Sequence, residues 1–290
     1  MAAKFQSAKL GAAALAFGMT LMGISALSTE AAARVMINAD FFGTGDSDIK
    51  DSNGDLNTKA YGINVNTTYF SLGAKRTDYD FSGVEDFGFD SANTLYGDLH
   101  YEGSFSNNLT YSLGLTLGAL YESELDLGDS YAVAPRAVLG YRFANGMTGF
   151  LGAYVNLNGA DNVYLPIIGL KLGDEKDQGW SGSIAYPATR VQYRFNSFWA
   201  ADATFLTVRD TFHLDEENDR GELSDGYLRE KSYGMGLGVT INPLTHLQLS
   251  AGLFSYFDRE FELYDKDGDE LGSFETDPAY GAYVRGSLVF

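Results

Sequence analysis

Apolar and polar residues alternate at every second position along much of this chain, and that pattern most constrains its fold. From Tyr280 to Phe290, the even positions are aromatic, aliphatic or glycine, and the odd positions are mostly polar or small. A period of two places successive side chains on opposite faces of a β-strand. The segment therefore predicts a strand with one apolar and one polar face, and it runs to the final residue although chain ends usually fray.

This terminal pattern resembles the C-terminal strand of Gram-negative outer-membrane β-barrels, which ends in phenylalanine and serves as the assembly signal. The resemblance implies that Leu288 and Phe290 are recognised by the outer-membrane assembly machinery. The N-terminus agrees, because two lysines, an apolar stretch over 10–27 and an Ala-Ala-Ala site at 31–33 are typical of a secretory signal peptide. We expect residues 1–33 to be removed and the mature protein to lie in the cell outer membrane.

Composition narrows the function classes. The chain has no cysteine, which excludes a lipoprotein anchor, disulfides and thiol chemistry. Its net charge of −19 argues against nucleic acid as a partner. The 34 glycines, 19 tyrosines and 20 phenylalanines suit β-structure better than helix bundles.

The alternation of the terminal strand recurs along the chain. It predicts about twelve strands, an even number as bacterial barrels require, or ten if the stretch 180–195 lies outside the wall. The expected strands are 61–69, 95–105, 111–121, 131–143, 147–157, 163–173, 180–186, 190–195, 198–212, 233–241, 247–261 and 280–290.

The connections between these strands alternate in length and charge. Short turns at Asn107, Asn145, Asn196 and Pro243 alternate with long acidic stretches. The acidic stretches are 78–90, 122–129, 214–226 and 264–273. We therefore predict an all-β fold, a transmembrane antiparallel up-and-down β-barrel over 59–290, with short periplasmic turns and long acidic extracellular loops. The acidic segment 34–58 is expected to be a periplasmic lead-in or lumen plug.

The spacing of aromatic residues favours a membrane barrel over a soluble one. Aromatic residues recur ten positions apart on the apolar faces, as in Tyr131 and Tyr141 or Tyr280 and Phe290. Ten residues at ~3.3 Å rise and ~40° tilt project to ~25 Å, the height of the apolar band between aromatic girdles. The alternatives are a periplasmic β-sandwich and a lipocalin-like barrel, which have no reason for this spacing.

From Leu165 onward the chain also resembles an uncharacterised family of proteobacterial outer-membrane barrels, known as a domain of unknown function. The matching stretches are Leu165 to Gly169, Trp180 to Pro187, Arg190 to Phe195, Leu228-Arg229-Glu230 and Phe257-Asp258-Arg259. The resemblance implies a porin-like barrel in the outer membrane. It implies no activity.

The inward faces of the predicted strands carry a cluster of charged residues. Its members are Asp98, His100, Glu102, Arg136, Arg142, Lys171, Arg190, Arg194, Asp202 and Arg285. They could line a wet lumen with a basic constriction that selects solutes by charge, or they could pair across the lumen and plug it. The first option predicts a narrow passive pore for small hydrophilic solutes or ions, motivated also by the glycine-rich inner face. The second predicts a closed structural or surface-binding barrel that displays acidic loops.

Catalysis and metal binding are the remaining options. Asp210, His213 and Asp215 lie near an outer rim, but Asp210 and His213 differ in parity and should point to opposite faces. We therefore expect no catalytic residues, and a hydrolase is the least favoured reading. Two acidic segments resemble the start of a calcium loop without its glycine at position six and its glutamate at position twelve. Their possible Ca²⁺ ligands are Asp51, Asn53 and Asp55, and Asp265, Asp267 and Asp269. Solvated acidic turns are the favoured explanation of both segments, and we expect no cofactor.

Overall fold

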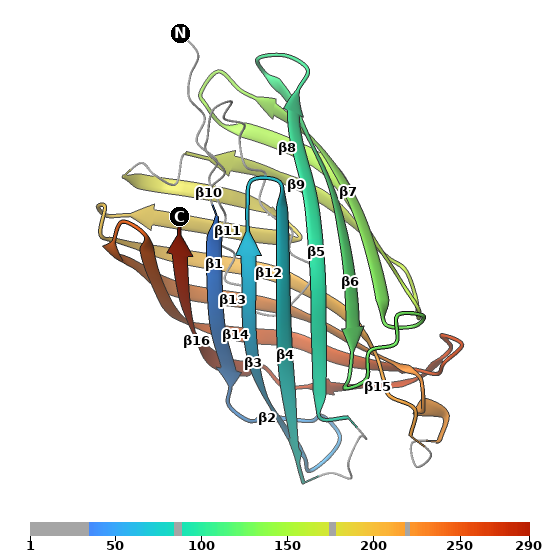
Figure 1. Cartoon of the computed structure of the whole chain (residues 1–290). Coiled ribbons are helices and arrows are strands. Elements are labelled where there is room, and N and C mark those ends of the chain that lie inside the picture. Colours follow the sequence, from blue (N-terminus) through green and yellow to red (C-terminus); the bar gives the residue numbers. More distant parts are fainter. Residues whose placement is uncertain (1–34, 84–88, 174–177, 218–220) are drawn as a thin grey trace.

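Strands pair with their chain neighbours from β3 to β14, and the ring closes through β16 and β1, with β1 lying between β16 and β3 (Figure 1). The computed structural model describes residues 35–83, 89–173, 178–217 and 221–290. Within these residues the wall is a closed antiparallel barrel of fourteen strands, and the short β2 and β15 continue the lines of β1 and β16 at one end of it. The predicted signal peptide lies outside the described residues.

The strands that form the wall vary from seven to eighteen residues. They are β1 (Met36–Thr44), β3 (Asp55–Asn66), β4 (Phe70–Ser82), β5 (Ser91–Ser104), β6 (Leu109–Tyr121), β7 (Tyr131–Arg142), β8 (Thr148–Asn158), β9 (Val163–Leu172), β10 (Gly179–Tyr186), β11 (Ala188–Arg194), β12 (Trp199–His213), β13 (Tyr227–Leu244), β14 (Leu247–Tyr264) and β16 (Ala279–Val289). At the outer end of the wall, β2 (Ser47–Asp48) extends the line of β1, and β15 (Glu270–Thr276) extends that of β16.

The predicted number of strands, twelve or ten, is wrong because two strands were missed. β1 lies in the segment expected to be a lead-in or plug, so residues 36–44 form wall instead. β4 was missed because its outer part carries Arg76, Asp78 and Asp80 on the outward face, which hides the period of two. The expected hairpin of β10 and β11 is confirmed.

The outside of the barrel is apolar. Large apolar side chains that point away from the lumen are exposed on every side of the wall. They include Ile63, Leu72, Leu95, Leu99, Leu113, Leu117, Leu139, Leu151, Ile168, Ile184, Leu237, Leu253 and Val284. Tyr131 and Tyr141 lie at the two ends of the outward face of β7, as their spacing predicted. This surface suits the hydrocarbon layer of a membrane, where a closed barrel also satisfies every backbone hydrogen bond.

The lipid-facing role of this surface predicts the effect of a charge on it. Leu237 lies in the middle of β13 and its side chain is 67% exposed. Leu237→Arg should lower the free energy of unfolding of the protein in lipid vesicles by about 2–4 kcal/mol, because a charge would face hydrocarbon. Leu271→Arg near the outer end of β15, in the extension of the wall beyond β16, is the control and should stay within about 0.5 kcal/mol of the wild type. Equal costs for the two variants, measured by urea titration in vesicles, would contradict a lipid-facing β13.

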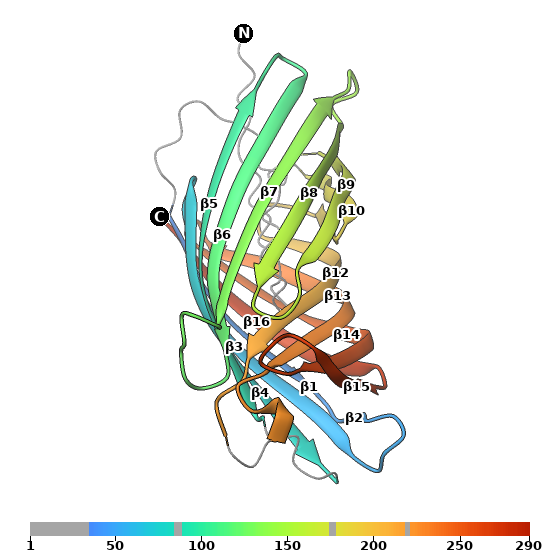
Figure 2. The same ribbon diagram turned by 90° about the vertical axis from the view of Figure 1, so that its right-hand side faces the viewer.

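The two ends of the barrel differ. Tight connections join the strands at the end where β1 begins and β16 ends, and longer segments with β2, β15 and a short 3₁₀ helix, η1 (Gly221–Leu223), lie at the other end (Figure 2). This asymmetry agrees with periplasmic turns and outer loops. Among the described residues, no helix has the length and apolar character needed to cross a membrane.

The interior is filled by apolar side chains toward the outer end. One cluster gathers Leu56, Tyr79, Phe89, Phe212, Leu228 and Phe261 with inward residues of β7 to β9. A second joins Phe42, Ala60, Val208, Phe254, Tyr256, Ala279 and Tyr283. These clusters occupy much of the inner face at that end.

The inward glycines make room for these large side chains. A Cβ on Gly238 would lie 2.1 Å from the Tyr283 hydroxyl, and one on Gly252 would lie 2.5 Å from the Tyr283 ring. Tyr283 thus lies flat against the wall over both residues. The glycine-rich face is consequently occupied space at these positions, and it is not by itself a sign of an open pore.

Candidate functional site

The first part of the candidate site is an ion pair that runs along the wall. Arg136 of β7 donates two hydrogen bonds to Asp98 of β5, at 2.6 and 2.9 Å, and Thr116 of the intervening β6 donates a third at 2.6 Å. His100 Nδ1 lies 3.3 Å from the same carboxylate. The guanidinium lies over Gly114, where a Cβ would be 2.4 Å from it. Three of the predicted charged residues therefore meet here without crossing the lumen.

Three more of the predicted residues share one register row. Arg142 of β7 pairs with Thr148, Thr148 with Lys171 of β9, Lys171 with Ser183, and Ser183 with Arg190 of β11. We call Arg142, Lys171 and Arg190 the cation row. Its members are half-buried, and they lie two strands apart, which corresponds to ~10 Å.

Carboxylates flank this row on one side. Asp202 of β12 lies 3.9 Å from Arg190, and Arg285 of β16 lies 3.9 Å from Asp40 of β1. Asp40 was missed because it lies in the segment predicted as a plug. Arg194 lies two inward positions beyond Arg190, toward the periplasmic end of β11. Glu102 lies one inward position beyond His100 on β5.

A second polar group spans the lumen near its outer end. Arg259 of β14 donates to Glu230 of β13 at 2.9 Å and to Thr58 of β3 at 3.1 Å. The Tyr79 hydroxyl of β4 donates to the other Glu230 oxygen at 3.0 Å. β16 and β1 separate β14 from β3 in the ladder order, so this group, which we call the outer bridge, joins strands that are not ladder neighbours. The Arg259 side chain is fully buried.

A β-bulge turns Arg259 inward. The β13–β14 register shifts between Lys231 and Tyr233, and Asp258 has a φ of 54°, a left-handed conformation that aspartate tolerates better than most residues. The analysis of charges on the inner face missed the outer bridge because the bulge breaks the parity rule. The available signal was the family resemblance, since Glu230 and Arg259 belong to two of its motifs.

β12 extends beyond the strand that pairs with it. Its ladder with β11 ends at the pair of Ala188 and Leu206, followed by one hydrogen bond from Thr207 to the carbonyl of Pro187. At its tip β12 meets β6 in parallel, where the Glu122 N–H donates to the His213 carbonyl at 2.9 Å. Both ribbon views show the long, inclined β12 to β14 passing the outer ends of β7 to β9 (Figures 1 and 2).

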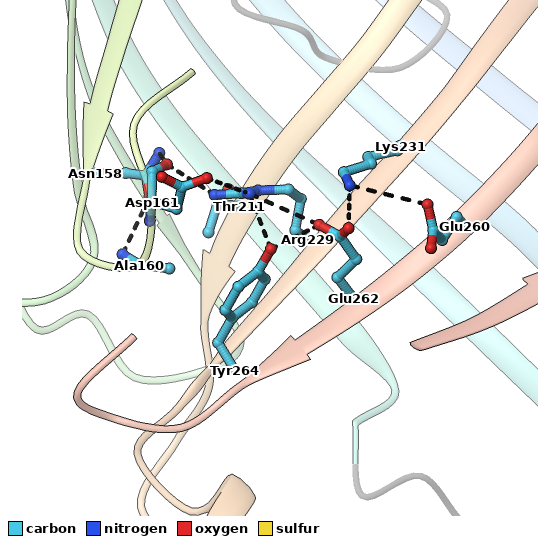
Figure 3. A network of polar contacts seen from close by, with 9 residues as sticks. All are labelled: Asn158, Ala160, Asp161, Thr211, Arg229, Lys231, Glu260, Glu262 and Tyr264. Atoms are coloured by element: carbon cyan, nitrogen blue, oxygen red, sulfur yellow. Dashed lines mark hydrogen bonds and ion pairs between the residues drawn. The ribbon is translucent and has the colours of Figure 1, made fainter. Parts of the chain in front are cut away.

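We call the junction between Val208–His213 of β12 and the outer ends of β8 and β9 the seam. On the other side, the β9 ladder with β10 begins only at Ile168, so the outer half of β9 has no strand ladder there among the described pairs. Side chains close the seam instead. Arg229 of β13 donates to the Asp161 carbonyl at 2.7 Å and to its carboxylate at 3.1 Å, and it donates to Thr211 at 3.0 Å (Figure 3).

We call the pair of Arg229 and Asp161 the latch. Further contacts hold the residues on both sides of it. Asn158 donates to the Asp161 carbonyl at 3.0 Å, so the β8–β9 connection is locally ordered. On the β13–β14 side, Tyr264 accepts from Arg229 at 3.0 Å and donates to Glu262 at 2.7 Å, and Lys231 pairs with Glu262 (Figure 3). The Arg229 side chain is 4% exposed and that of Asp161 is 64% exposed. The latch thus reaches from the wall to solvent.

The residues considered for catalysis take separate partners. His213 Nε2 lies 3.1 Å from Asp225, and Asp215 accepts from the Glu124 N–H at 3.0 Å. Asp210 joins neither residue by a hydrogen bond or ion pair within the described part of the chain.

The calcium candidates form turns. Asp265 accepts from the backbone N–H groups of Asp267 and Asp269, at 2.9 and 2.8 Å. Asp55 accepts from Ser82 at 3.5 Å, and Asp51 has a φ of 59°. Over residues 35–83, 89–173, 178–217 and 221–290, no group of three or more metal-ligating side chains is assembled. Calcium binding stays a prediction.

The fold and its apolar outer surface define the class: a transmembrane β-barrel of the outer membrane. The resemblance to outer-membrane barrels implied a porin-like barrel, and the closed order of paired strands confirms it. Leu288 and Phe290 lie on the outward face beside β1, and their role in assembly stays a prediction.

Solved structures of outer-membrane channels are similar to the chain in outline. An outer-membrane channel from Pseudomonas putida F1 is 10% identical, with 89% of this chain and 95% of that one covered and a TM-score of 0.45. OprB of Pseudomonas putida is 8% identical, with coverages of 89% and 94% and a TM-score of 0.37. The KdgM porin in complex with disordered oligogalacturonate is 8% identical, with coverages of 86% and 97% and a TM-score of 0.36. No family model matches the sequence, and no curated protein matches it.

Proposed function

We propose that this protein is a narrow passive pore of the outer membrane for small hydrophilic solutes, and that its lumen favours anions. The observation that carries the proposal is the cation row, which places three positive side chains on one inward row of a polar periplasmic half. Rings or rows of fixed charge select ions by sign in other pores. The ion pairs of Asp98 with Arg136 and of Asp40 with Arg285 run along the wall and do not cross the lumen.

Conductance in planar lipid bilayers tests the proposal. The purified full-length protein should produce discrete conductance steps, and the reversal potential in a salt gradient should show preference for chloride over potassium. A protein that inserts and folds but never conducts would overturn the proposal.

The second candidate is a closed barrel that displays acidic loops at the cell surface. The observation that favours it is the pair of apolar clusters with the outer bridge, which fill the outer end of the lumen. In that case, deletion of the acidic loops should abolish the cellular phenotype while permeability to small solutes stays unchanged. Altered permeability would count against this candidate.

A further inference from the structure

The outer end of the lumen is obstructed along the barrel axis. The two apolar clusters fill it, and the outer bridge ties β3 and β4 to β13 and β14 through buried hydrogen bonds. A solute that entered along the axis would have to displace packed aromatic rings and separate a buried ion pair. Removing one partner of such a pair is strongly unfavourable. The route from outside must therefore avoid the barrel axis at this end.

We propose that the seam between β12 and the outer ends of β8 and β9 is the external entrance of the pore, and that the Arg229–Asp161 latch holds it closed. The proposal rests on the pore function above. Elsewhere the wall is held by continuous backbone ladders, which cannot open without leaving hydrogen-bonding groups unpaired in a membrane. At the seam a few side-chain contacts perform the same task, so this is the part of the wall that opens at least cost (Figure 3).

The chemistry of the seam suits hydrophilic solutes. Arg229, Asp161, Thr211 and Asn158 line it, and Asp161 is largely exposed, so its surroundings are water or lipid headgroups. An entrance for hydrocarbon chains would instead be apolar.

Buried polar atoms near the seam give an independent indication. Asn156 Oδ1, Thr207 Oγ1 and His213 Nδ1 are buried and lack a hydrogen-bond partner among the described residues. Native proteins satisfy nearly all buried polar groups, and exceptions require an explanation. A strand edge that separates and admits water or solute provides one, because these atoms then gain partners in the open state.

Accessibility of the inner face tests the entrance directly. Ser232 lies on the inward face of β13 opposite Val208 and is buried, and the chain has no cysteine of its own. In intact cells that carry Ser232→Cys, a membrane-impermeant maleimide applied from outside should react slowly. Adding Asp161→Lys should accelerate labelling about ten-fold, because repulsion of Arg229 replaces a partly exposed, charge-assisted contact.

A matched control keeps the test specific. Glu275 of β15 lies 2.5 Å from Lys50 at the same end of the barrel and is 51% exposed, but it lies outside the seam. Glu275→Lys should leave the labelling rate unchanged. Equal rates with and without Asp161→Lys, or equal acceleration by Glu275→Lys, would overturn the proposal.

Conductance separates this inference from the proposed function. If the wild type conducts, Asp161→Lys should raise the open fraction several-fold, and an unchanged open fraction would overturn the seam as entrance. If neither protein conducts while Asp161→Lys still accelerates labelling, the pore function fails and the opening of the seam stands.

Discussion

Glu230→Gln should lower the free energy of unfolding by about 3–5 kcal/mol, the cost of leaving one member of a buried ion pair without its partner. The Arg259 side chain has no exposed surface, and Glu230 accepts hydrogen bonds from both Arg259 and Tyr79. The variant would leave a buried guanidinium facing a neutral amide. Urea titration of the protein in lipid vesicles, followed by the fluorescence of its two tryptophans, measures the change.

Two controls assign that loss to the buried charge. The double variant Glu230→Gln/Arg259→Met should recover most of the stability, since replacing both members of a buried pair by neutral groups is often close to neutral. Glu260→Gln on β14, next to Arg259, weakens a partly exposed ion pair with Lys231, at 3.9 Å, and should cost less than about 1 kcal/mol. If Glu230→Gln matched Glu260→Gln in stability, the outer bridge would not hold the wall together.

Neutralising the cation row should reverse the ion preference of the pore. A unit charge ~5 Å from a passing ion contributes ~0.8 kcal/mol in water, so three charges together contribute ~2 kcal/mol before screening by salt. Arg142→Gln/Lys171→Gln/Arg190→Gln should therefore lower the permeability ratio of chloride to potassium by about ten-fold or more. Asp202, which lies beside Arg190, would then add to the preference for cations.

The reversal potential across a planar bilayer measures this ratio. Arg76→Gln is the control, because Arg76 is half-exposed, pairs with Asp78 and lies on the outward face of β4. It should leave selectivity unchanged. A triple variant that keeps the selectivity of the wild type would show that the cation row does not line the conducting path.

The alternation of side chains was enough to predict the barrel and most of its strands, because lipid-facing and inward residues must alternate in any such wall. It failed where strands leave the membrane. The outer part of β4 carries charged residues on its outward side and so shows no clear apolar face, whereas β1 has a short apolar outward face of Ile37, Ala39 and Phe41 that was overlooked beside the acidic stretch that follows it. Strand number was consequently underestimated.

The inward charges could be predicted as a set, but their partners could not. Asp98 and Arg136 are separated by a whole strand and meet because Gly114 and Thr116 between them are small. Arg259 faces inward only because of a β-bulge. Arg229 reaches Asp161 only because β12 extends beyond the end of its ladder with β11. Such contacts depend on register and strand length, which no local pattern encodes.

The placement of β1 against β16 has a consequence for biogenesis. The two strands that complete the cylinder come from opposite ends of the polypeptide, so the final edge-to-edge union waits until the whole chain has been exported. Until that union, each carries an unpaired edge that can join another molecule. The cell must therefore protect an incomplete sheet with unpaired edges from association until the barrel closes. A chain that ends before its last strand could not close and would remain an open sheet.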